Sequence, residues 1–455
     1  MMNKLKKWCM LGCFLALCLI LTSMITRYTA VKAASKLMSV NNIVVKSILP
    51  YLPLPEQREE TKKIDWSSLY PFGNTDETPA VQRDSDRSSA TNKAAKIISK
   101  INSKKGSFEE RASKWILKNI AGYQEFVELY NRYNNTINWN IISKKEYNGV
   151  VELENGQLTV FKNKDNVSEK IKNLSELANF SEKNGAAFFY LSAPSKISRH
   201  DKTYDSLDFS NANTDELLEG LRKNGVDYID FRDNIDEEGL TADNVFFRTD
   251  HHWTPESGLW ATRILAKYLN DNGMIQSDLS LLDAEKWDRD IYKNYFLGSR
   301  GKKTTLARTT PDDITIYHPK FDTRLHLEIP NKNIAADGNF DITYDMKRLE
   351  KVDYYNENPY AAYSWSDRPY TYIRNDDAIN DTTILLIKNS FGNVVLPFLS
   401  LQAKNIFAID PRVFTGSIHE FIKQKKPDIV IVLYSANYFN GIIDYTEHND
   451  PWDFR

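Results

Sequence analysis

The chain carries, late in its sequence, an aliphatic run that ends in a short polar turn: Ile384-Leu385-Leu386-Ile387-Lys388-Asn389-Ser390-Phe391-Gly392-Asn393. Four consecutive aliphatic residues are typical of a strand that is buried on both faces, as the strands of parallel sheets are. Ser390 stands where such a strand would turn sharply into a helix, which presents a side chain at the carboxyl edge of the sheet beside free backbone N–H groups. The segment therefore predicts both a fold class and a candidate nucleophile.

Helix-like and strand-like segments alternate around this run. Asn155-Gly156 between two apolar runs predicts a hairpin. Helices are predicted over residues 168–183, 215–223 and 254–270, and strands over residues 186–191, 226–231, 383–387, 406–409 and 429–433. This order predicts an α/β fold with a doubly wound, mostly parallel sheet and helices on both faces. Residues 274–380 lack the alternation and are expected to form an inserted cap region.

The N-terminal part differs from the rest. Lysines followed by an apolar run over residues 8–25, and small residues at Val31 and Ala33, indicate a signal peptide or an N-terminal membrane anchor over residues 1–33. Residues 34–106 are punctuated by proline and rich in Ser, Asn and Lys, which predicts a low-order tether, and residues 107–455 form the main domain. We expect an extracytoplasmic protein, membrane-anchored or secreted. Whether the first segment is cleaved stays open.

The composition narrows the class of protein. The 455 residues are 41% hydrophobic and 26% charged, and 59 Lys and Arg against 61 Asp and Glu give a net charge of -2. A chain without a basic excess is not expected to bind nucleic acid. The cysteines are Cys9, Cys13 and Cys18, all within residues 1–33, so the main domain has no thiol for catalysis or zinc binding.

The densest chemical motif is Thr249-Asp250-His251-His252-Trp253-Thr254-Pro255. In extended backbone, residues two apart point the same way, so Asp250 and His252 are expected to meet while His251 faces the other side. A carboxylate on one imidazole nitrogen fixes the tautomer and leaves the other nitrogen free to take a proton, for instance from Ser390. A helix-capping Asp beside a buried His is the structural alternative. A metal site is another, but both histidines can reach one ion only through a sharp bend, so no metal and no cofactor is predicted.

Together the two motifs resemble the DHHW proteins, relatives of the AlgJ/AlgX type of polysaccharide O-acetyltransferases with an SGNH-hydrolase-like fold. The resemblance spans roughly residues 107–450 and implies a triad of Asp250, His252 and Ser390. Asn389 stands where many SGNH-type proteins carry Asp. By the same resemblance, the loop with Lys196 lies at the same sheet edge. The further candidates for substrate binding or the oxyanion site are Asn389, Phe391, Lys196, Arg412 and Trp253.

The resemblance implies an acyltransferase that acetylates hydroxyls of a cell-envelope polysaccharide or exopolysaccharide through the Ser-His-Asp triad. Its expected partners are a polysaccharide acceptor and a multipass membrane acyltransferase of the MBOAT type that supplies the acetyl group. Two alternatives stay open: an acetyl esterase with the same triad, and a non-catalytic glycan-binding subunit that uses the 24 tyrosines and 9 tryptophans for stacking. The sequence does not identify the acceptor glycan, the donor or the oligomeric state.

Overall fold

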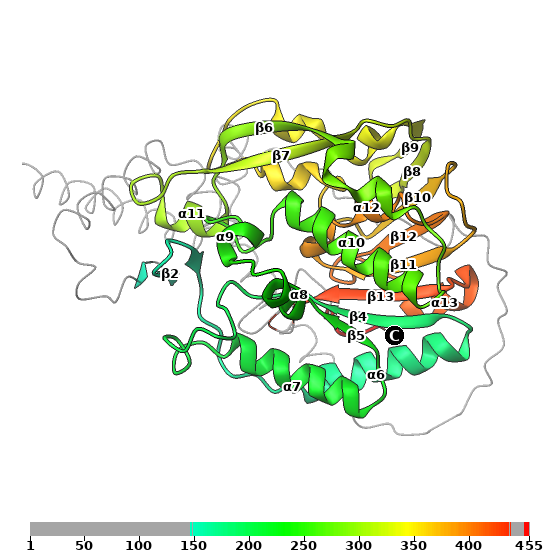
Figure 1. Cartoon of the computed structure of the whole chain (residues 1–455), viewed down its shortest axis with the longest axis horizontal. Coiled ribbons are helices and arrows are strands. Elements are labelled where there is room, and N and C mark those ends of the chain that lie inside the picture. The colour runs from blue at the N-terminus through cyan, green and yellow to red at the C-terminus, as the bar shows by residue number, and fades with distance from the viewer. Residues whose placement is uncertain (1–145, 148, 436, 438–449, 455) are drawn as a thin grey trace, which may run out of the picture. The chain divides into compact units, whose positions relative to one another are not determined.

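Figure 1 shows the computed structural model of the chain, which describes residues 146–147, 149–435, 437 and 450–454. The predicted signal or anchor at residues 1–33, the tether at residues 34–106 and the start of the main domain at residue 107 lie outside the described residues. Among the described residues, no helix is long and apolar enough to cross a membrane.

A sheet of eight strands forms the centre of the described part of the chain, in the order β5-β4-β13-β11-β12-β10-β8-β9. Five neighbouring strands run parallel: β5 (Tyr228–Asp230), β4 (Ala187–Ser192), β13 (Ile429–Tyr434), β11 (Thr383–Lys388) and β12 (Asn405–Ile409). They correspond to the five predicted strands, with ends shifted by up to a few residues.

The predicted doubly wound, mostly parallel arrangement needs correction, because the sheet is mixed. The other three strands are β10 (Tyr370–Asn375), β8 (Leu325–Ile329) and β9 (Ile334–Gly338), and each pairs antiparallel to its neighbours. Antiparallel strands can follow one another through short turns without a crossover helix, so these residues lack the helix–strand alternation that marks the parallel part.

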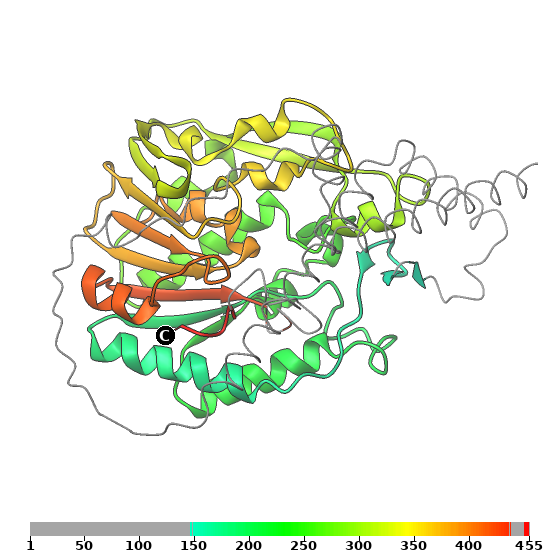
Figure 2. The ribbon, with the colours of Figure 1, turned by 180° about the vertical axis from the view of Figure 1, so that it is seen from behind.

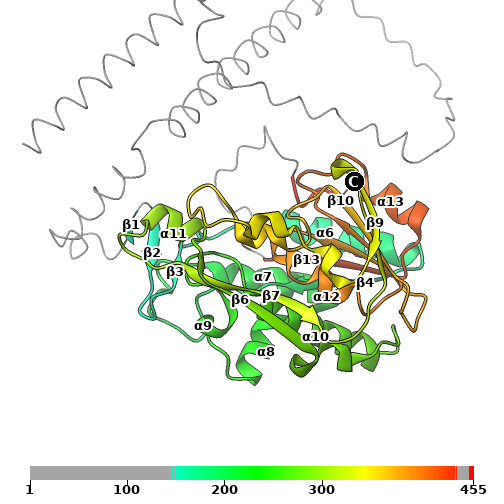
Figure 3. The same ribbon diagram turned by 90° about the horizontal axis from the view of Figure 1, so that it is seen from above.

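Helices cover both faces of the sheet (Figures 2 and 3). On one face, Phe189 of β4, Leu386 of β11 and Ile431 of β13 share a core with Leu265 of α10 (Pro255–Asp271) and Phe398 of α12 (Leu396–Leu399). The opposite face is covered by α6 (Ser168–Lys183), which packs against α7 (Ser210–Lys223) and α13 (Ile418–Lys425). The coarse prediction of an α/β fold with helices on both faces is confirmed.

Residues 274–380, predicted as an inserted cap, divide between a separate antiparallel ribbon and the main sheet. Strands β6 (Trp287–Phe296) and β7 (Asp312–Pro319) form a separate antiparallel ribbon, with α11 (Ser299–Thr304) between them, whereas β8, β9 and β10 belong to the main sheet. Short 3-10 helices occupy much of the rest, at Leu279–Leu282, Ala284–Lys286, Pro330–Lys332, Phe340–Thr343, Met346–Leu349 and Pro359–Ala362 (η8). That residues 274–380 are an insertion remains a prediction.

Smaller elements complete the fold. The predicted hairpin around Asn155-Gly156 is present: β2 (Val150–Glu152) pairs antiparallel with β3 (Leu158–Thr159), and β1 (Glu146–Tyr147) pairs with β2. Short helices α8 (Phe231–Glu237) and α9 (Ala242–Val245) connect β5 to the segment that precedes α10.

Helix α10 begins as predicted and approaches the chain beyond β11 very closely. The Thr254 hydroxyl accepts the Ser257 N–H at 3.2 Å, and Pro255 fills the first turn, where no N–H is needed. A Cβ atom at Gly258 would lie 2.4 Å from the carbonyl oxygen of Val394. Gly258 therefore sets the spacing between the start of α10 and the turn after β11.

Candidate active site

The Asp250-His251-His252 segment is the tip of a tight loop, not an extended strand. Phe246 and Trp253 pair as an antiparallel bridge, and the Phe247 N–H donates to the His252 carbonyl at 3.2 Å. At the tip, the His252 N–H donates to Asp250 Oδ1 at 3.1 Å. The expected opposite orientation of His251 is wrong, because the turn brings its ring against that of His252, with centroids 3.8 Å apart and the ring planes tilted by 38°.

Asp250, His252 and Ser390 form a continuous hydrogen-bonded chain. His252 Nδ1 lies 2.5 Å from Asp250 Oδ1, and His252 Nε2 lies 2.7 Å from Ser390 Oγ, although the two residues are 138 positions apart. Since an ionised carboxylate can only accept, Nδ1 carries the proton and Nε2 is free to accept the serine O–H. Ser390 is the first residue of the short helix η9 (Ser390–Asn393), at the carboxyl end of β11.

Asp250 is held from the far side by the start of α11. The Ser299 N–H donates to Asp250 Oδ2 at 2.5 Å, and a Cβ at Gly298 would lie 2.3 Å from Asp250 Cβ, so only glycine fits there. Burial alone would raise the pKa of Asp250, but the charges of His251 and His252 and these hydrogen bonds hold its pKa well below the usual value. The carboxylate is therefore ionised and oriented.

The His252 ring is clamped by a tyrosine that the sequence did not indicate. Tyr360, on η8, stacks on it with centroids 4.2 Å apart and an interplanar angle of 13°, and its hydroxyl donates to the Ser390 carbonyl at 2.9 Å. Tyr360 thus touches both members of the His–Ser pair. Asp312 at the start of β7 was also missed: it accepts the N–H groups of Arg248 (3.0 Å) and Thr249 (2.8 Å), which anchors the loop.

Of the further candidates, Trp253 does not face a substrate. It is fully buried, and its indole N–H donates to the Phe391 carbonyl at 2.8 Å, which fastens the loop to the serine turn. The Phe391 N–H donates to Asn389 Oδ1 at 2.9 Å and is therefore not free for an oxyanion, although the Phe391 ring reaches the cleft described below. Asn389 Nδ2 is buried and has no hydrogen-bond acceptor among the described residues.

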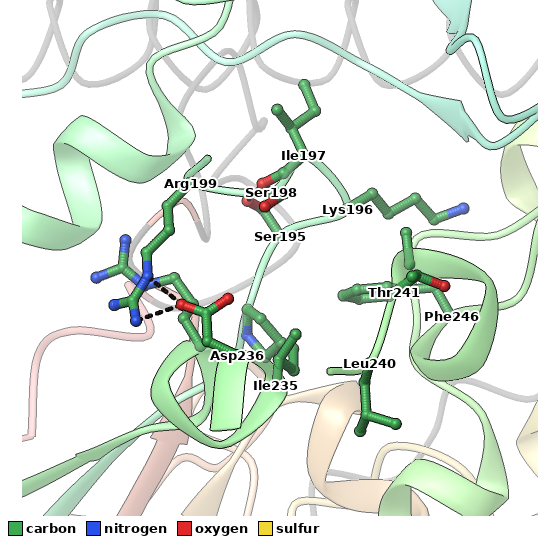
Figure 4. Close-up of a pocket in the computed structure, with 13 residues that line it drawn as sticks. Ser195, Lys196, Ile197, Ser198, Arg199, Ile235, Asp236, Leu240, Thr241 and Phe246 are labelled. Atoms are coloured by element: carbon green, nitrogen blue, oxygen red, sulfur yellow. Dashed lines mark hydrogen bonds and ion pairs between the residues drawn. The ribbon is translucent and has the colours of Figure 1, made fainter. Parts of the chain in front are cut away.

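Lys196 lines the cleft described below, but its ammonium group needs correction as a substrate-binding group. Its ammonium donates to the carbonyl oxygens of Leu158 (3.0 Å), Phe247 (2.6 Å) and Arg248 (3.0 Å), which uses all three of its donors. Burial lowers the pKa of Lys196 to about 7. In Figure 4 its side chain points away from Arg199, which pairs with Asp236 on the other side of the loop.

Arg412 is the third correction, because its guanidinium is already paired. Its Nε donates to Asp410 Oδ1 at 2.9 Å, and one terminal nitrogen lies 2.9 Å from Asp367. Asp367 in turn accepts the Asn393 side-chain amide at 3.0 Å, and Asn393 accepts the buried Lys388 ammonium at 2.5 Å. This polar network supports the turn after β11 from beneath and does not contact Ser390 Oγ.

An open cleft of about 650 Å³ adjoins the triad. It is lined by the hairpin residues 158–160, by the loop around Lys196, and by Lys162, His251, Arg300 and Phe391. Ser390, next to Phe391, is partly exposed. The cleft reaches the triad through the adjacent residues His251 and Phe391, and none of the three triad residues is among those that line it. A second cavity, drawn in Figure 4, shares residues 194–197 with this cleft and includes neither the triad nor its immediate neighbours.

The same loop tip can also be interpreted as a metal-binding site. Ligand atoms of Asp250, His251 and His252 all lie within 4.8 Å of one another, because the turn supplies the sharp bend that the sequence interpretation required. Among the described residues, no fourth Asp, Glu, His or Cys joins this group, and three protein ligands with a water are the composition of a catalytic zinc site. In this structure His252 Nδ1 and Asp250 Oδ1 are hydrogen-bonded to each other.

Two family descriptions match the chain. The DHHW protein family matches residues 237–409, which contain all three triad residues, and the SGNH hydrolase-like domain of the acetyltransferase AlgX matches residues 155–285. No curated protein matches the chain.

Solved structures with the same fold include PatB1 of Bacillus cereus. PatB1 with a sulfonyl adduct is 18% identical, with a TM-score of 0.52 over 67% of this chain and 98% of that one. A second PatB1 structure is 17% identical, with a TM-score of 0.50 over 67% and 99%. A DHHW family protein from Eubacterium siraeum is 18% identical, with a TM-score of 0.49 over 65% and 94%. The resemblance read from the two motifs is therefore confirmed as a similarity: residues 237–409 resemble the DHHW proteins, and residues 155–285 resemble the SGNH hydrolase-like domain of AlgX.

Proposed function

We propose that the protein is an extracytoplasmic serine O-acyltransferase that acetylates hydroxyl groups of a cell-envelope polysaccharide or exopolysaccharide. The observation that carries the proposal is the 2.7 Å approach of Ser390 Oγ to His252 Nε2, with Asp250 on the opposite nitrogen of the ring. A serine hydroxyl is a weak nucleophile until an adjacent base takes its proton, and this arrangement supplies one.

The reaction has two halves. Ser390 Oγ attacks the carbonyl carbon of an acetyl ester while His252 Nε2 takes the hydroxyl proton, and Asp250 stabilises the imidazolium. The intermediate collapses, His252 returns the proton to the departing oxygen, and the acetyl group stays on Ser390. A sugar hydroxyl then attacks this ester, His252 acts first as base and then as acid, and Ser390 is regenerated with the acetyl group on the sugar.

Two further observations support the proposal. The AlgX match is to an acetyltransferase domain. A structure of PatB1 carries a sulfonyl adduct, and sulfonyl halides sulfonylate a serine hydroxyl that an adjacent base activates more readily than an ordinary one.

The proposal also includes the cellular location of the reaction and the source of the acetyl group. The apolar N-terminal run supports export or a membrane anchor, and a multipass acyltransferase partner would bring the acetyl group to this side of the membrane. A fusion of residues 1–106 to a reporter that is active only after export tests the location. A cytoplasmic reporter would contradict it.

The test of the chemistry is a pair of serine variants. Full-length protein is incubated with a chromogenic acetyl ester and an oligosaccharide mixture, and acetylated sugar is measured by mass spectrometry. Ser390→Ala should abolish acetyl transfer and labelling by a sulfonyl fluoride, whereas the exposed Ser280→Ala should preserve both. Transfer by Ser390→Ala equal to that of the unaltered protein would contradict the proposal.

The same assay separates the alternatives. An esterase releases free acetate at a rate that oligosaccharide does not change, because water replaces the sugar hydroxyl. A non-catalytic glycan-binding subunit predicts that cells producing Ser390→Ala acetylate their glycans normally.

A further inference from the structure

The cleft beside Ser390 is lined by basic side chains, of which Lys162 and Arg300 have no carboxylate partner among the described residues, whereas His251 contacts Asp250. Lys162, His251 and Arg300 line it together, and we call these three residues the basic cleft. Among the described residues, no carboxylate lies within 4.0 Å of the charged groups of Lys162 or Arg300, and Arg300 Nε is buried without a hydrogen-bond acceptor. Burying part of an unpaired guanidinium is costly, so a ligand that supplies the acceptor would be bound favourably.

The other charged groups near the basic cleft are already engaged. Asp208 accepts the Lys162 backbone N–H at 2.7 Å and the Ser210 N–H at 3.0 Å, together with the Ser210 hydroxyl. Asp250 is bound to His252 and to the Ser299 N–H, and the Lys196 ammonium is bound to three carbonyl oxygens. None of these carboxylates forms an ion pair with Lys162 or Arg300, although Asp208 also lines the cleft and the charges of Asp208 and Asp250 oppose the lowering of the pKa values of Lys162 and Arg300.

The cationic groups also act on one another. Burial lowers the pKa of Lys162, and the charge of Arg300 lowers it further. Desolvation and the charge of His252 lower the pKa of His251 to about 3, and the charges of Arg300 and Lys162 contribute. His251 is therefore neutral at neutral pH, and Lys162 and Arg300 supply the positive charge.

The size and position of the cleft fit the acceptor better than the acetyl group. An acetyl group needs room only beside Ser390 Oγ, whereas the cleft extends from His251 and Phe391 past Arg300 to the hairpin residues 158–160 and Lys162. A sugar with its hydroxyl at Ser390 would extend along this cleft past His251. A planar guanidinium with free N–H groups matches the two oxygens of a carboxylate or phosphate.

We propose that Arg300 and Lys162 form an anion-binding subsite for the acceptor, so that the preferred glycan carries a carboxylate or phosphate group near the hydroxyl that is acetylated. The proposal rests on the proposed acyltransferase function and adds the charge class of its substrate.

The test compares acceptors of different charge. Acetyl transfer from a neutral ester is measured to a uronic acid oligosaccharide, a glycan bearing glycerol phosphate and a neutral oligosaccharide of equal length. In the unaltered protein, one of the two anionic acceptors should have the lowest KM, which identifies carboxylate or phosphate as the ligand. In Arg300→Gln and Lys162→Gln, the ratio of kcat/KM for that acceptor over the neutral one should fall about tenfold each, mainly through KM.

Two matched variants control for charge and folding. Lys164→Gln removes a charge two residues from Lys162, but Lys164 pairs with Glu216 and does not line the cleft, so the ratio should stay unchanged. Arg300→Lys retains the charge and should recover part of the preference. An unchanged ratio in Arg300→Gln and Lys162→Gln, or equal KM values for all three acceptors in the unaltered protein, would overturn the subsite.

A binding measurement separates the subsite from the chemistry. Calorimetry with full-length Ser390→Ala should detect tighter binding of the anionic acceptor than of the neutral one, with a difference that shrinks as salt is added. If the tighter binding of the anionic acceptor disappears when Arg300→Gln is added, the subsite is supported. This holds even if no form of the protein transfers acetyl groups, because the absence of transfer would contradict only the proposed enzymatic function. Equal affinity for the two acceptors would contradict the anion-binding subsite even if acetyl transfer occurs.

Discussion

Two aspartates in this chain bind a basic residue two positions later in nearly the same way. The backbone N–H of His252 donates to Asp250 Oδ1 at 3.1 Å, and that of Arg412 donates to Asp410 Oδ1 at 3.1 Å. The side chains repeat the contact, through His252 Nδ1 at 2.5 Å and Arg412 Nε at 2.9 Å. Both carboxylates are buried. The local geometry alone therefore does not distinguish a reactive pair from a structural one.

The difference lies in what the basic group can still do. A guanidinium has five donors, has no acceptor and keeps its proton, and a terminal nitrogen of Arg412 is taken by Asp367. An imidazole held by its Nδ1–H keeps a lone pair on Nε2, and that atom faces Ser390. One pair can move a proton and the other can only hold the turn together.

The largest expected effect comes from making the two pairs alike. His252→Arg keeps a donor toward Asp250 but removes the proton acceptor that lies 2.7 Å from Ser390 Oγ, so acetyl-ester turnover should fall on the order of 10⁴-fold. His252→Gln, which is smaller and uncharged, should lose as much. Stopped-flow assays of acetate release check this. If His252→Arg kept a tenth of the activity, proton transfer by His252 would have to be given up.

The carboxylates give the next largest contrast. Asp250→Asn should lower kcat on the order of 10³-fold while the protein stays folded, because the amide no longer stabilises the imidazolium. Asp410→Asn should instead lower the free energy of unfolding by about 3 kcal/mol, because it breaks a buried ion pair. Urea unfolding and kcat are measured on both variants. The comparison fails if Asp410→Asn loses as much kcat per folded molecule as Asp250→Asn.

A tenfold effect is expected from the tyrosine that clamps the pair. Tyr360→Phe keeps the ring on His252 but removes the hydroxyl that holds the Ser390 carbonyl, so kcat should fall about tenfold with KM nearly constant. Tyr363→Phe is the matched control, because that buried tyrosine donates to the Thr315 carbonyl at 2.7 Å. Both variants should lose similar thermal stability. Equal kcat losses would mean that Tyr360 acts only on the fold.

The smallest expected effect is on the free energy of unfolding at acidic pH. The pKa of Asp250 is held below its usual value of about 3.9, so below about pH 4 the unfolded chain binds more protons there than the folded one. The stability that Asp250 contributes is present above this pH and is lost as the pH falls through the folded pKa. The difference in unfolding free energy between the unaltered protein and Asp250→Asn should therefore be constant near pH 7 and shrink toward pH 3. A difference that grows in acid would contradict this sign.

The elements that depend on local sequence patterns could be predicted from the sequence, and those that depend on contacts between distant residues could not. Helix α6 and the five parallel strands were predictable because caps and aliphatic runs are local patterns. Asp250, His252 and Ser390 were identified from two motifs and the geometry of a strand end. Strands β8, β9 and β10 were not, because their apolar residues lie among turns and short 3-10 helices.

The supporting residues could not be predicted either. Ser299, Asp312 and Tyr360 reach the loop tip through the β6–β7 ribbon and η8, and no spacing in the sequence marks such long-range contacts. Trp253, Lys196 and Arg412 were candidates for binding substrate or the oxyanion, but their donors are occupied by backbone carbonyls or carboxylates. Residue type indicates what a side chain can bind and leaves open what it already holds.

The contact at Gly258 has a consequence for judging variants and distant relatives of this chain. A methyl group there would push α10 away from the segment after β11 and so draw the imidazole away from the hydroxyl, with every reacting residue still present. A protein that keeps the aspartate, histidine and serine but carries a larger residue at this position would look intact by motif and be inert in an assay. If the proposed function is correct, relatives that share it should be recognised by the glycine as well as by the aspartate, the histidine and the serine.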